Sequence, residues 1–429
     1  FEGVGAERIL VENGKAAGVM TPQGPIRAKT VVICGGLWSR DLAATAGVAL
    51  PLHAAEHFYC VTEPIPDLPR DLPVLFLGDE WTYYKEDAGK LLVGFFEPVA
   101  KPWGQDGVPQ DFAFGTLPED VDHIAPHLDQ ATRRVPVLQK TGIQLFFNGP
   151  ESFTPDDRYL LGETPEVPGL FCATGFNSIG ILSSGGVGKA LADWIRDRKP
   201  PMELADVDVR RMQAFQINRR YLHDRTTETL GLLFDMHWPY RQFATARDVR
   251  KSPFHDRLLA QGAFMAEAAG WQRPGFFGKP GERPEVTYSY ARPSWFAATA
   301  AECRNTAANA TLFDLSCFTK YAVDGRDACA VLNRISAANV DVAPGRVVYT
   351  QWLNEAGGIE ADVTVIRLSE TSFLVTTLAA AQRRDLAWLM RHIPEGAHCF
   401  ARDVTSGLPM LALMGPKARA LLQRLTPED

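Results

Sequence analysis

The sequence predicts a multidomain protein in which α/β segments alternate with sheet-rich α+β segments. The chain has 429 residues, enough for two or three domains. Residues 169–195 read as an apolar strand, a glycine cluster and an amphipathic helix, which is typical of α/β folds. Residues 49–150 are instead rich in short strands, which indicates a separate antiparallel sheet domain.

The composition is that of an ordinary globular protein, with 46 % hydrophobic and 22 % charged residues. The formal net charge is −7, so we expect no nucleic-acid partner. No apolar run reaches the roughly 18 residues of a membrane span, so we expect no membrane association. The 7 cysteines are scattered, which indicates a reducing compartment, no disulfide scaffold and no metal site.

The N-terminal elements can be assigned in order. Asn13-Gly14 is a strong hairpin signal between two short strands, and a third strand follows residues 22–24. Residues 30–34 form a continuous apolar run, typical of a buried parallel strand, which Gly35-Gly36 ends before a helix. Within the strand-rich region, one helical segment interrupts the strands at residues 118–138.

The second half of the chain has two compositions. Residues 198–285 are rich in Pro, Arg, Trp and Gly, which indicates a connecting region with some helix and no core of its own. From about Tyr288, helices and strands follow one another in an α+β pattern. The expected divisions are an α/β domain at 1–48 and 151–203, a sheet domain at 49–150, a linker at 204–285 and a last domain at 286–429.

The glycine cluster in the helix at 180–195 fails both common phosphate-binding patterns. A P-loop needs GxxxxGK[ST], but Ala190 follows Lys189 and Ser183 stands at the first glycine position. A GxGxxG motif occurs nowhere in the chain. The glycines still remove side chains from the first turns, so a ligand can approach that backbone closely. The helix N-terminus favours an anion or an electron-rich ring, and tight helix–sheet packing is the alternative.

The stretch ATGFNSIGILSSGGVGKALADWI closely resembles the last strand, loop and helix of FAD-dependent oxidoreductases of the D-amino-acid oxidase type. VVICGGLWS resembles the strand that ends against FAD in that family. In such folds the last helix points its N-terminus at the flavin, where reduction places negative charge. The resemblance implies FAD contacts from Val4, in the first strand, and from two loops, comprising Gly35, Gly36, Trp38, Asn177, Ser178, Ile179, Gly180 and Ile181.

Longer segments resemble one branch of that family, the sarcosine and dimethylglycine dehydrogenases. KTGIQLFFNGPESFTPDDRYLLGETPEVPGLF carries this resemblance, and TLFDLSCFTKYAVDGRDA resembles the T-protein-like folate-binding domain of the same enzymes. The implied fold is a partial FAD-binding Rossmann-like domain with an antiparallel substrate domain, a linker and a partial folate domain, and tetrahydrofolate is the second implied cofactor. The family's phosphate loop and the end of its folate domain have no counterpart, so we expect a fragment truncated at both ends.

The resemblance implies FAD-dependent oxidative N-demethylation of sarcosine, dimethylglycine or a similar N-methyl amine. Hydride passes to flavin N5, and the one-carbon unit passes to tetrahydrofolate or leaves as formaldehyde. An electron-transfer flavoprotein is an implied partner, and the implied compartment is the bacterial cytoplasm or the mitochondrial matrix. The alternative is a non-catalytic regulatory protein of the same architecture, like the regulatory subunit of pyruvate dehydrogenase phosphatase.

Two candidate catalytic residues follow from the same resemblance. His57 and Tyr83 stand where the family places an active-site histidine and tyrosine. A histidine can hold or accept the ammonium proton near neutral pH, and a tyrosine can hydrogen-bond the substrate. A hydrogen-bonded sheet histidine and a core aromatic are the structural alternatives, and Tyr84 is the contact if the register shifts by one residue.

Two further regions concern the binding of folate and of the substrate carboxylate. Asp362 matches the carboxylate that folate domains set against the pterin, and Tyr349 lies on the preceding strand. T-proteins usually carry a second aspartate where this chain has Ala361. Leu182 stands where monomeric sarcosine oxidases place a lysine for the substrate carboxylate, so that carboxylate is held elsewhere or the substrate differs.

Overall fold

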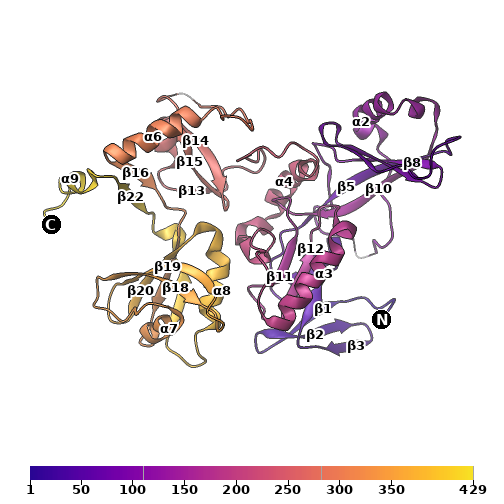
Figure 1. The fold of residues 1–429 in the computed structure, drawn as a ribbon. Coiled ribbons are helices and arrows are strands. Elements are labelled where there is room, and N and C mark those ends of the chain that lie inside the picture. Colours follow the sequence, from indigo (N-terminus) through magenta and orange to yellow (C-terminus); the bar gives the residue numbers. More distant parts are fainter. Residues whose placement is uncertain (110, 282, 429) are drawn as a thin grey trace. The chain divides into compact units, whose positions relative to one another are not determined.

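The computed structural model describes residues 1–109, 111–281 and 283–428 and divides into two compact units (Figure 1). The first unit comprises Phe1–Arg210, Ala214–His237 and Ala244–Ala246. The second unit comprises Arg211–Gln213, Trp238–Phe243 and Arg247–Asp429. Among the described residues, no helix is both long and apolar enough to cross a membrane.

The first unit opens with the expected hairpin. Strands β1 (Arg8–Glu12) and β2 (Lys15–Thr21) pair antiparallel, and β3 (Gly24–Arg27) pairs with β2. Asn13 and Gly14 have φ values of 49° and 72° in the turn, the left-handed conformation that these two residues adopt most readily. The hairpin prediction is therefore confirmed.

A three-stranded mixed sheet forms the centre of the α/β part. Strand β12 (Leu170–Thr174) lies between β11 (Leu160–Glu163), to which it is antiparallel, and β4 (Val31–Ile33), to which it is parallel. The parallel strand predicted at residues 30–34 is confirmed. After β4 the chain turns through the 3-10 helix η1 (Gly36–Trp38) into α1 (Ser39–Ala44).

Helix α3 (Gly180–Asp197) follows β12 and packs along this sheet (Figure 1). Its buried side chains are Val187, Leu191 and Trp194, which recur at helical spacing, while Ala190 and Ile195 of the same stripe are only partly buried. The Trp194 ring lies directly over Gly162 of β11, where a Cβ atom would come within 2.5 Å of it. The glycine therefore allows the helix to approach the sheet closely at this point.

The sheet domain is a six-stranded antiparallel sheet in the order β10–β5–β8–β7–β6, with β9 pairing β5. Helix α2 (Val121–Arg134) covers one face, and Asp120 caps it by accepting a hydrogen bond from His123 N–H. The opposite face packs in part against α4 (Arg219–Leu232) through Leu230. The strands are β5 (His53–Thr62), β6 (Leu75–Leu77), β7 (Thr82–Asp87), β8 (Lys90–Phe95), β9 (Pro102–Trp103) and β10 (Ile143–Phe153).

The second unit contains a five-stranded sheet in the order β18–β19–β20–β17–β21. Helices α7 (Ala328–Ile335) and α8 (Gln382–Arg391) pack against one of its faces, around the fully buried Trp352. Strands β16 and β22 pair separately. The strands are β16 (Thr311–Asp314), β17 (Thr319–Asp324), β18 (Val347–Leu353), β19 (Ile359–Arg367), β20 (Ser372–Thr377), β21 (Phe400–Asp403) and β22 (Leu411–Met414).

The region expected to be a linker contains a small sheet that the sequence did not indicate. Its order is β13 (Arg250–Lys251), β15 (Trp271–Phe277) and β14 (Ala263–Ala268), and α6 (Phe296–Ala308) contacts β15. The remaining short helices are η2 (Gly78–Glu80), η3 (Pro136–Lys140), η4 (Val209–Arg211), η5 (Ala214–Ile217), α5 (His255–Ala260), η6 (Ala379–Ala381), η7 (Thr405–Gly407) and α9 (Ala418–Leu422).

Substituting Trp194 tests how α3 is held to its sheet. Removing the indole leaves a cavity between α3, Phe171 and Gly162, so we expect Trp194→Ala to lower the free energy of unfolding by about 3–5 kcal/mol. Urea unfolding followed by circular dichroism measures this loss. Leu182→Ala on the same helix is the control, because that side chain is 85 % exposed and its loss should change stability little. Equal effects of the two substitutions would contradict this account of the packing.

Candidate functional site

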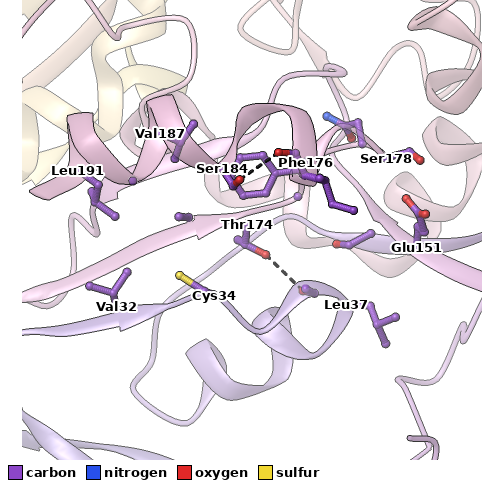
Figure 2. Close-up of a pocket in the computed structure, with 18 of the residues that line it drawn as sticks. Val32, Cys34, Leu37, Glu151, Thr174, Phe176, Ser178, Ser184, Val187 and Leu191 are labelled. Carbon is purple, nitrogen blue, oxygen red and sulfur yellow. Dashed lines mark hydrogen bonds between the residues drawn. The ribbon is translucent and has the colours of Figure 1, made fainter. Parts of the chain in front are cut away.

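A cavity of about 740 Å³ lies where the parallel strands β4 and β12 end and α3 begins (Figure 2). In open α/β sheets, ligands bind beyond the carboxyl ends of the strands, which is where this cavity lies. The lining comes from three parts of the chain that are far apart in sequence, residues 32–38, 150–152 and 173–195. The cavity is therefore a product of the fold and not of one local motif.

The end of β12 is tied to the loop after β4. The Thr174 hydroxyl lies 3.2 Å from the Gly36 carbonyl oxygen and 2.9 Å from Ser39 Oγ, with hydrogen bonds to both. Gly36 has a φ of 54°, which a residue with a side chain rarely adopts. These contacts bring the two loops that the sequence predicted as a cofactor site to one side of the cavity.

The loop between β12 and α3 is held by Asn177. Its φ is 51° and that of Ser178 is 68°, so two consecutive residues adopt the left-handed conformation. The Asn177 side chain is only 2 % exposed, and its Oδ1 accepts a hydrogen bond of 2.9 Å from Thr154 N–H. The Asn177 amide oxygen is thus used to fix the loop, while Ser178 lies at the cavity edge (Figure 2).

The start of α3 presents open backbone. No side chain caps its N-terminus, and Ile181 is 98 % exposed. A Cβ atom built at Gly185, Gly186 or Gly188 would have no atom outside the local helix within 4 Å. These glycines therefore do not serve helix–sheet packing within the described structure, unlike Gly162. Of these three glycines only Gly188 lines the cavity, and a ligand there could contact the helix backbone at Gly188 and at Gly180.

The predicted cofactor residues divide into two groups. Those that line the cavity are Gly36, Trp38, Asn177, Ser178, Gly180 and Ile181. Gly35 and Ile179 are not in the lining: Gly35 lies next to Ser39, and Ile179 is the N-cap residue that precedes α3. The placement of Val4 in a strand is wrong, because β1 begins only at Arg8, where pairing with β2 starts. Val4 is not among the lining residues.

His57 and Tyr83 lie on one face of the antiparallel sheet, on strands β5 and β7. Both contact Phe96, with ring-centroid distances of 4.7 Å for His57 and 6.1 Å for Tyr83. His57 is 6 % exposed, and its Nδ1 is buried without a hydrogen-bond partner among the described residues. A buried polar atom normally has a hydrogen-bond partner, and His57 Nδ1 has none among the described residues. For this atom the structural alternative, a hydrogen-bonded sheet histidine, therefore does not apply.

The register distinguishes Tyr83 from Tyr84. Tyr84 is 3 % exposed and packs into the cluster beneath α2, on the face opposite to His57. Tyr83 instead lies across Gly94 of the neighbouring strand β8, where a Cβ atom would come within 2.0 Å of its ring. Gly149 of β10 makes space for the Phe147 ring in the same way. Two mid-strand glycines thus let aromatic rings lie flat across this face.

Glu151 is a residue of this site that the sequence reasoning missed. It lies on β10 and lines the cavity (Figure 2). Burial, the Glu151 charge and Tyr59 together raise the pKa of Tyr83 to about 12, so Tyr83 is a neutral hydrogen-bond donor at physiological pH. Glu151 therefore connects the cavity with the face that carries His57 and Tyr83.

In the second unit, the pairing of β18 with β19 brings Tyr349 and Asp362 together. Asp362 of β19 accepts hydrogen bonds of 2.8 Å from the Tyr349 hydroxyl and 2.9 Å from Gln351 Nε2, both on the neighbouring strand β18. The Tyr349 side chain is largely exposed, and the hydrogen bond to Asp362 raises its pKa. Ala361 faces the core, so an aspartate there would be buried. Within the described ranges, no group of three or more His, Cys, Asp or Glu is arranged to hold a metal ion.

Comparison with known families divides the chain into three matched regions. Residues 1–194 match the FAD dependent oxidoreductase family, and residues 199–252 match the FAD dependent oxidoreductase central domain. Residues 254–429 match the GCVT N-terminal domain. The last match begins within the region expected to be a linker and includes most of its small sheet.

Curated relatives match along almost the whole chain. The 4-methylaminobutanoate oxidase (formaldehyde-forming) of Paenarthrobacter nicotinovorans is 42 % identical over 428 residues, which are 100 % of this chain and 52 % of that protein. The mitochondrial pyruvate dehydrogenase phosphatase regulatory subunit of Mus musculus is 34 % identical, covering 97 % of this chain and 48 % of that protein. The mitochondrial sarcosine dehydrogenase of Homo sapiens is 33 % identical, covering 97 % of this chain and 49 % of that protein.

The matched models describe an FAD dependent oxidoreductase region followed by a GCVT domain. Residues 1–194 and 199–252 thus match FAD dependent oxidoreductase models and residues 254–429 match a GCVT model, and the relatives that are similar along almost the whole chain include 4-methylaminobutanoate oxidase and the sarcosine and dimethylglycine dehydrogenases. It spans about half the length of the curated relatives that it matches.

Gly94→Ala tests whether the space over β8 is needed for the Tyr83 ring. The added methyl group would overlap that ring, so we expect the free energy of unfolding to fall by about 1–3 kcal/mol and Tyr83 to be displaced. Denaturant unfolding measures the first effect. Gly185→Ala, which adds the same atom to an open helix position, is the control and should be neutral or slightly stabilising. A Gly94→Ala protein as stable as wild type would contradict the close approach.

Proposed function

We propose that the chain carries the flavin and amine sites of an enzyme for oxidative N-demethylation, with sarcosine, dimethylglycine, 4-methylaminobutanoate or a similar N-methyl amine as substrate. One observation carries the proposal. Strand β10 lines the cavity at residues 150–152 and also belongs to the sheet face that holds His57 and Tyr83. A cofactor in the cavity and an amine on that face would therefore be neighbours.

The described residues fit FAD. The uncapped start of α3 supplies N–H groups and a positive dipole end, which favour the electron-rich edge of a flavin. Gly180 and Gly188 leave the backbone of α3 accessible from the cavity, and Gly36, Trp38 and Ser178 would hold the ring from the other loops. When bound, FAD supplies the acceptor for the hydride of the N-methyl carbon.

The chain's own residues then prepare the amine. Hydride loss needs the nitrogen lone pair, so the ammonium form must first lose its proton. His57 can take that proton on Nδ1, which has no other partner among the described residues. The Tyr83 hydroxyl, neutral because its pKa is raised to about 12, donates a hydrogen bond to the substrate. Phe96 and Phe153 pack around His57 and exclude water from it.

The second unit supports folate as the acceptor of the one-carbon unit. Asp362 is fixed by Tyr349 and Gln351, and its carboxylate can accept the N–H groups of a pterin edge. Without folate, the same oxidation releases formaldehyde. Electrons leave either to an electron-transfer flavoprotein or to oxygen, and the names of the relatives include both dehydrogenases and an oxidase.

A regulatory role is the competing proposal, since a phosphatase regulatory subunit matches almost the whole chain. His57 with a free Nδ1 and Tyr83 on the same face favour the enzyme. Reduction of the flavin by an N-methyl amine distinguishes the two. A protein that binds a phosphatase and is reduced by no N-methyl amine would be the regulator.

His57→Gln should slow flavin reduction by N-methyl amines about a hundredfold, because it removes the proton acceptor. Tyr83→Phe should weaken substrate binding by about tenfold, the effect of one hydrogen bond. Stopped-flow absorbance of the full-length, FAD-loaded protein measures both. Tyr84→Phe is the matched control, since Tyr84 faces α2 and its hydroxyl has no hydrogen-bond partner among the described residues. Flavin reduction at the wild-type rate in the His57→Gln protein would contradict the proposed role of His57 as proton acceptor.

Asp362→Asn should weaken tetrahydrofolate binding by about tenfold, because a neutral amide replaces a carboxylate that accepts N–H groups. Calorimetric titration of tetrahydrofolate into the full-length protein measures the dissociation constant. Glu355→Gln removes one charge from the turn of the same β18–β19 hairpin and should leave binding unchanged. An unaltered dissociation constant in Asp362→Asn would place the folate elsewhere.

A further inference from the structure

A buried carboxylate lies between the antiparallel sheet and helix α2. Glu97 comes two residues after the end of β8, and its side chain is only 2 % exposed. Neither of its carboxylate oxygens has a hydrogen-bond partner among the described residues. Its ion-pair partner is His123 of α2, whose Nε2 lies 3.6 Å from Glu97 Oε1. Because a buried charge is costly unless a paired group compensates it, the protonation of this pair decides how well α2 fits the sheet.

The histidines of α2 lie in apolar surroundings. His123 and His127 are four residues apart and therefore share one face of the helix. His123 Nε2 and His127 Nδ1 are buried, and neither has a hydrogen-bond partner in the described ranges. The ring centroid of Phe58 is 5.5 Å from that of His123, and the ring centroid of Trp81 is 6.3 Å from that of His127. Burial lowers the pKa of His127, and the Glu97 charge partly offsets this effect. These rings exclude water, so a charge here is poorly screened.

Other charged groups beneath α2 have permanent partners. At the start of the helix, Lys101 pairs with Asp120 and also with Glu56, whose Oε1 lies 3.4 Å from Lys101 Nζ. At the end of the helix, Arg134 pairs with Glu80. Lysine and arginine keep their charges throughout the physiological pH range, so these pairs are independent of pH there. The pair of Glu97 and His123 differs, because histidine loses its proton within that range.

Helix α4 fixes the backbone of Glu97 from the other side. A Cβ atom at Gly231 of α4 would come within 2.7 Å of the Glu97 carbonyl oxygen. Gly231 carries no group that titrates. Tyr84 of β7 also faces α2, and burial raises its pKa, so it stays neutral. Glu97 therefore has no room to withdraw from α2, and an uncompensated charge is relieved by movement of α2 itself.

We propose that Glu97 and His123 form a pH-sensitive lock that docks α2 on the sheet. While His123 carries its proton, the pair has no net charge and α2 is held. As the pH rises through the range in which histidine deprotonates, roughly pH 6 to 8, the Glu97 carboxylate is left buried without a counter-charge. The lock therefore holds below this range and weakens above it. This inference does not depend on the proposed reaction.

The lock is connected to the sheet face that carries His57. Phe96 immediately precedes Glu97, and its ring centroid lies 4.7 Å from that of His57. The Phe96 N–H also donates a hydrogen bond of 2.9 Å to the carbonyl oxygen of Trp81, whose ring contacts His127 of α2. A change in the docking of α2 therefore alters the packing beside His57.

Amide hydrogen exchange of the full-length protein, measured by mass spectrometry between about pH 5.5 and 8.5, tests the lock. After correction for the intrinsic pH dependence of exchange, we expect the protection of residues 121–134 to fall at least about tenfold as the pH rises. Glu97→Gln removes the charge and keeps the shape of the side chain. Its α2 protection should therefore change by less than about twofold over the same range.

Glu80→Gln is the matched control, because Glu80 is also buried beneath α2 but pairs with an arginine. It should reduce α2 protection by a similar factor at every pH and leave the pH dependence intact. His123→Gln should give, already at the lowest pH, the weak protection that the wild-type protein shows at the highest.

α2 protection that is independent of pH in the wild-type protein would overturn the lock. So would a Glu97→Gln protein with the wild-type pH dependence. His123→Gln supplies the same test if Glu97→Gln does not fold, since a pH dependence retained without this histidine would assign the titration to another group and overturn the pair.

Discussion

The parallel pairing of β4 with β12 is the constraint on which the whole site depends. The two strands are separated in sequence by the entire antiparallel sheet domain, yet their carboxyl ends must meet for the cavity to exist. The Thr174 hydroxyl fixes this meeting through Gly36 and Ser39. Because the inserted domain leaves after β4 and returns through β10, the last residues of β10 become a wall of the cavity. One pairing thus places the cavity beside the sheet face that carries His57 and Tyr83, the two parts of the proposed site.

Much of the fold was predictable because its signals are local. The hairpin at Asn13-Gly14, the apolar run at 30–34 and the helix at 180–197 each follow from short-range chemistry, and each is found. The sheet at 250–277 was not predictable from composition. Its longest strand contains Pro274 and Gly275, and its shortest has two residues, so pairing partners supply the order that the local sequence lacks.

The site was predictable only in part, for the same reason. His57 and Tyr83 came from a resemblance, and the choice between Tyr83 and Tyr84 needed the strand register. Glu151 lies on the same sheet as His57 and Tyr83 only because β10, β5, β8 and β7 pair in this order. The spacing of these residues along the sequence does not indicate that pairing. One signal was present in the sequence. Glycines inside apolar strands mark close approaches, and Gly94 and Gly149 both lie beneath aromatic rings.

The two ionisable groups of the proposed amine site have different surroundings, and the chemistry needs that difference. An amine dissolved at neutral pH arrives as a cation but reacts only with its lone pair free. Glu151 lines the cavity. His57 is enclosed by Phe96 and Phe153, and its Nδ1 has no hydrogen-bond partner among the described residues, so in the proposed reaction it can receive a proton without competition from water. In the proposed reaction, transfer of the amine proton to His57 leaves the neutral amine with its lone pair available for hydride loss.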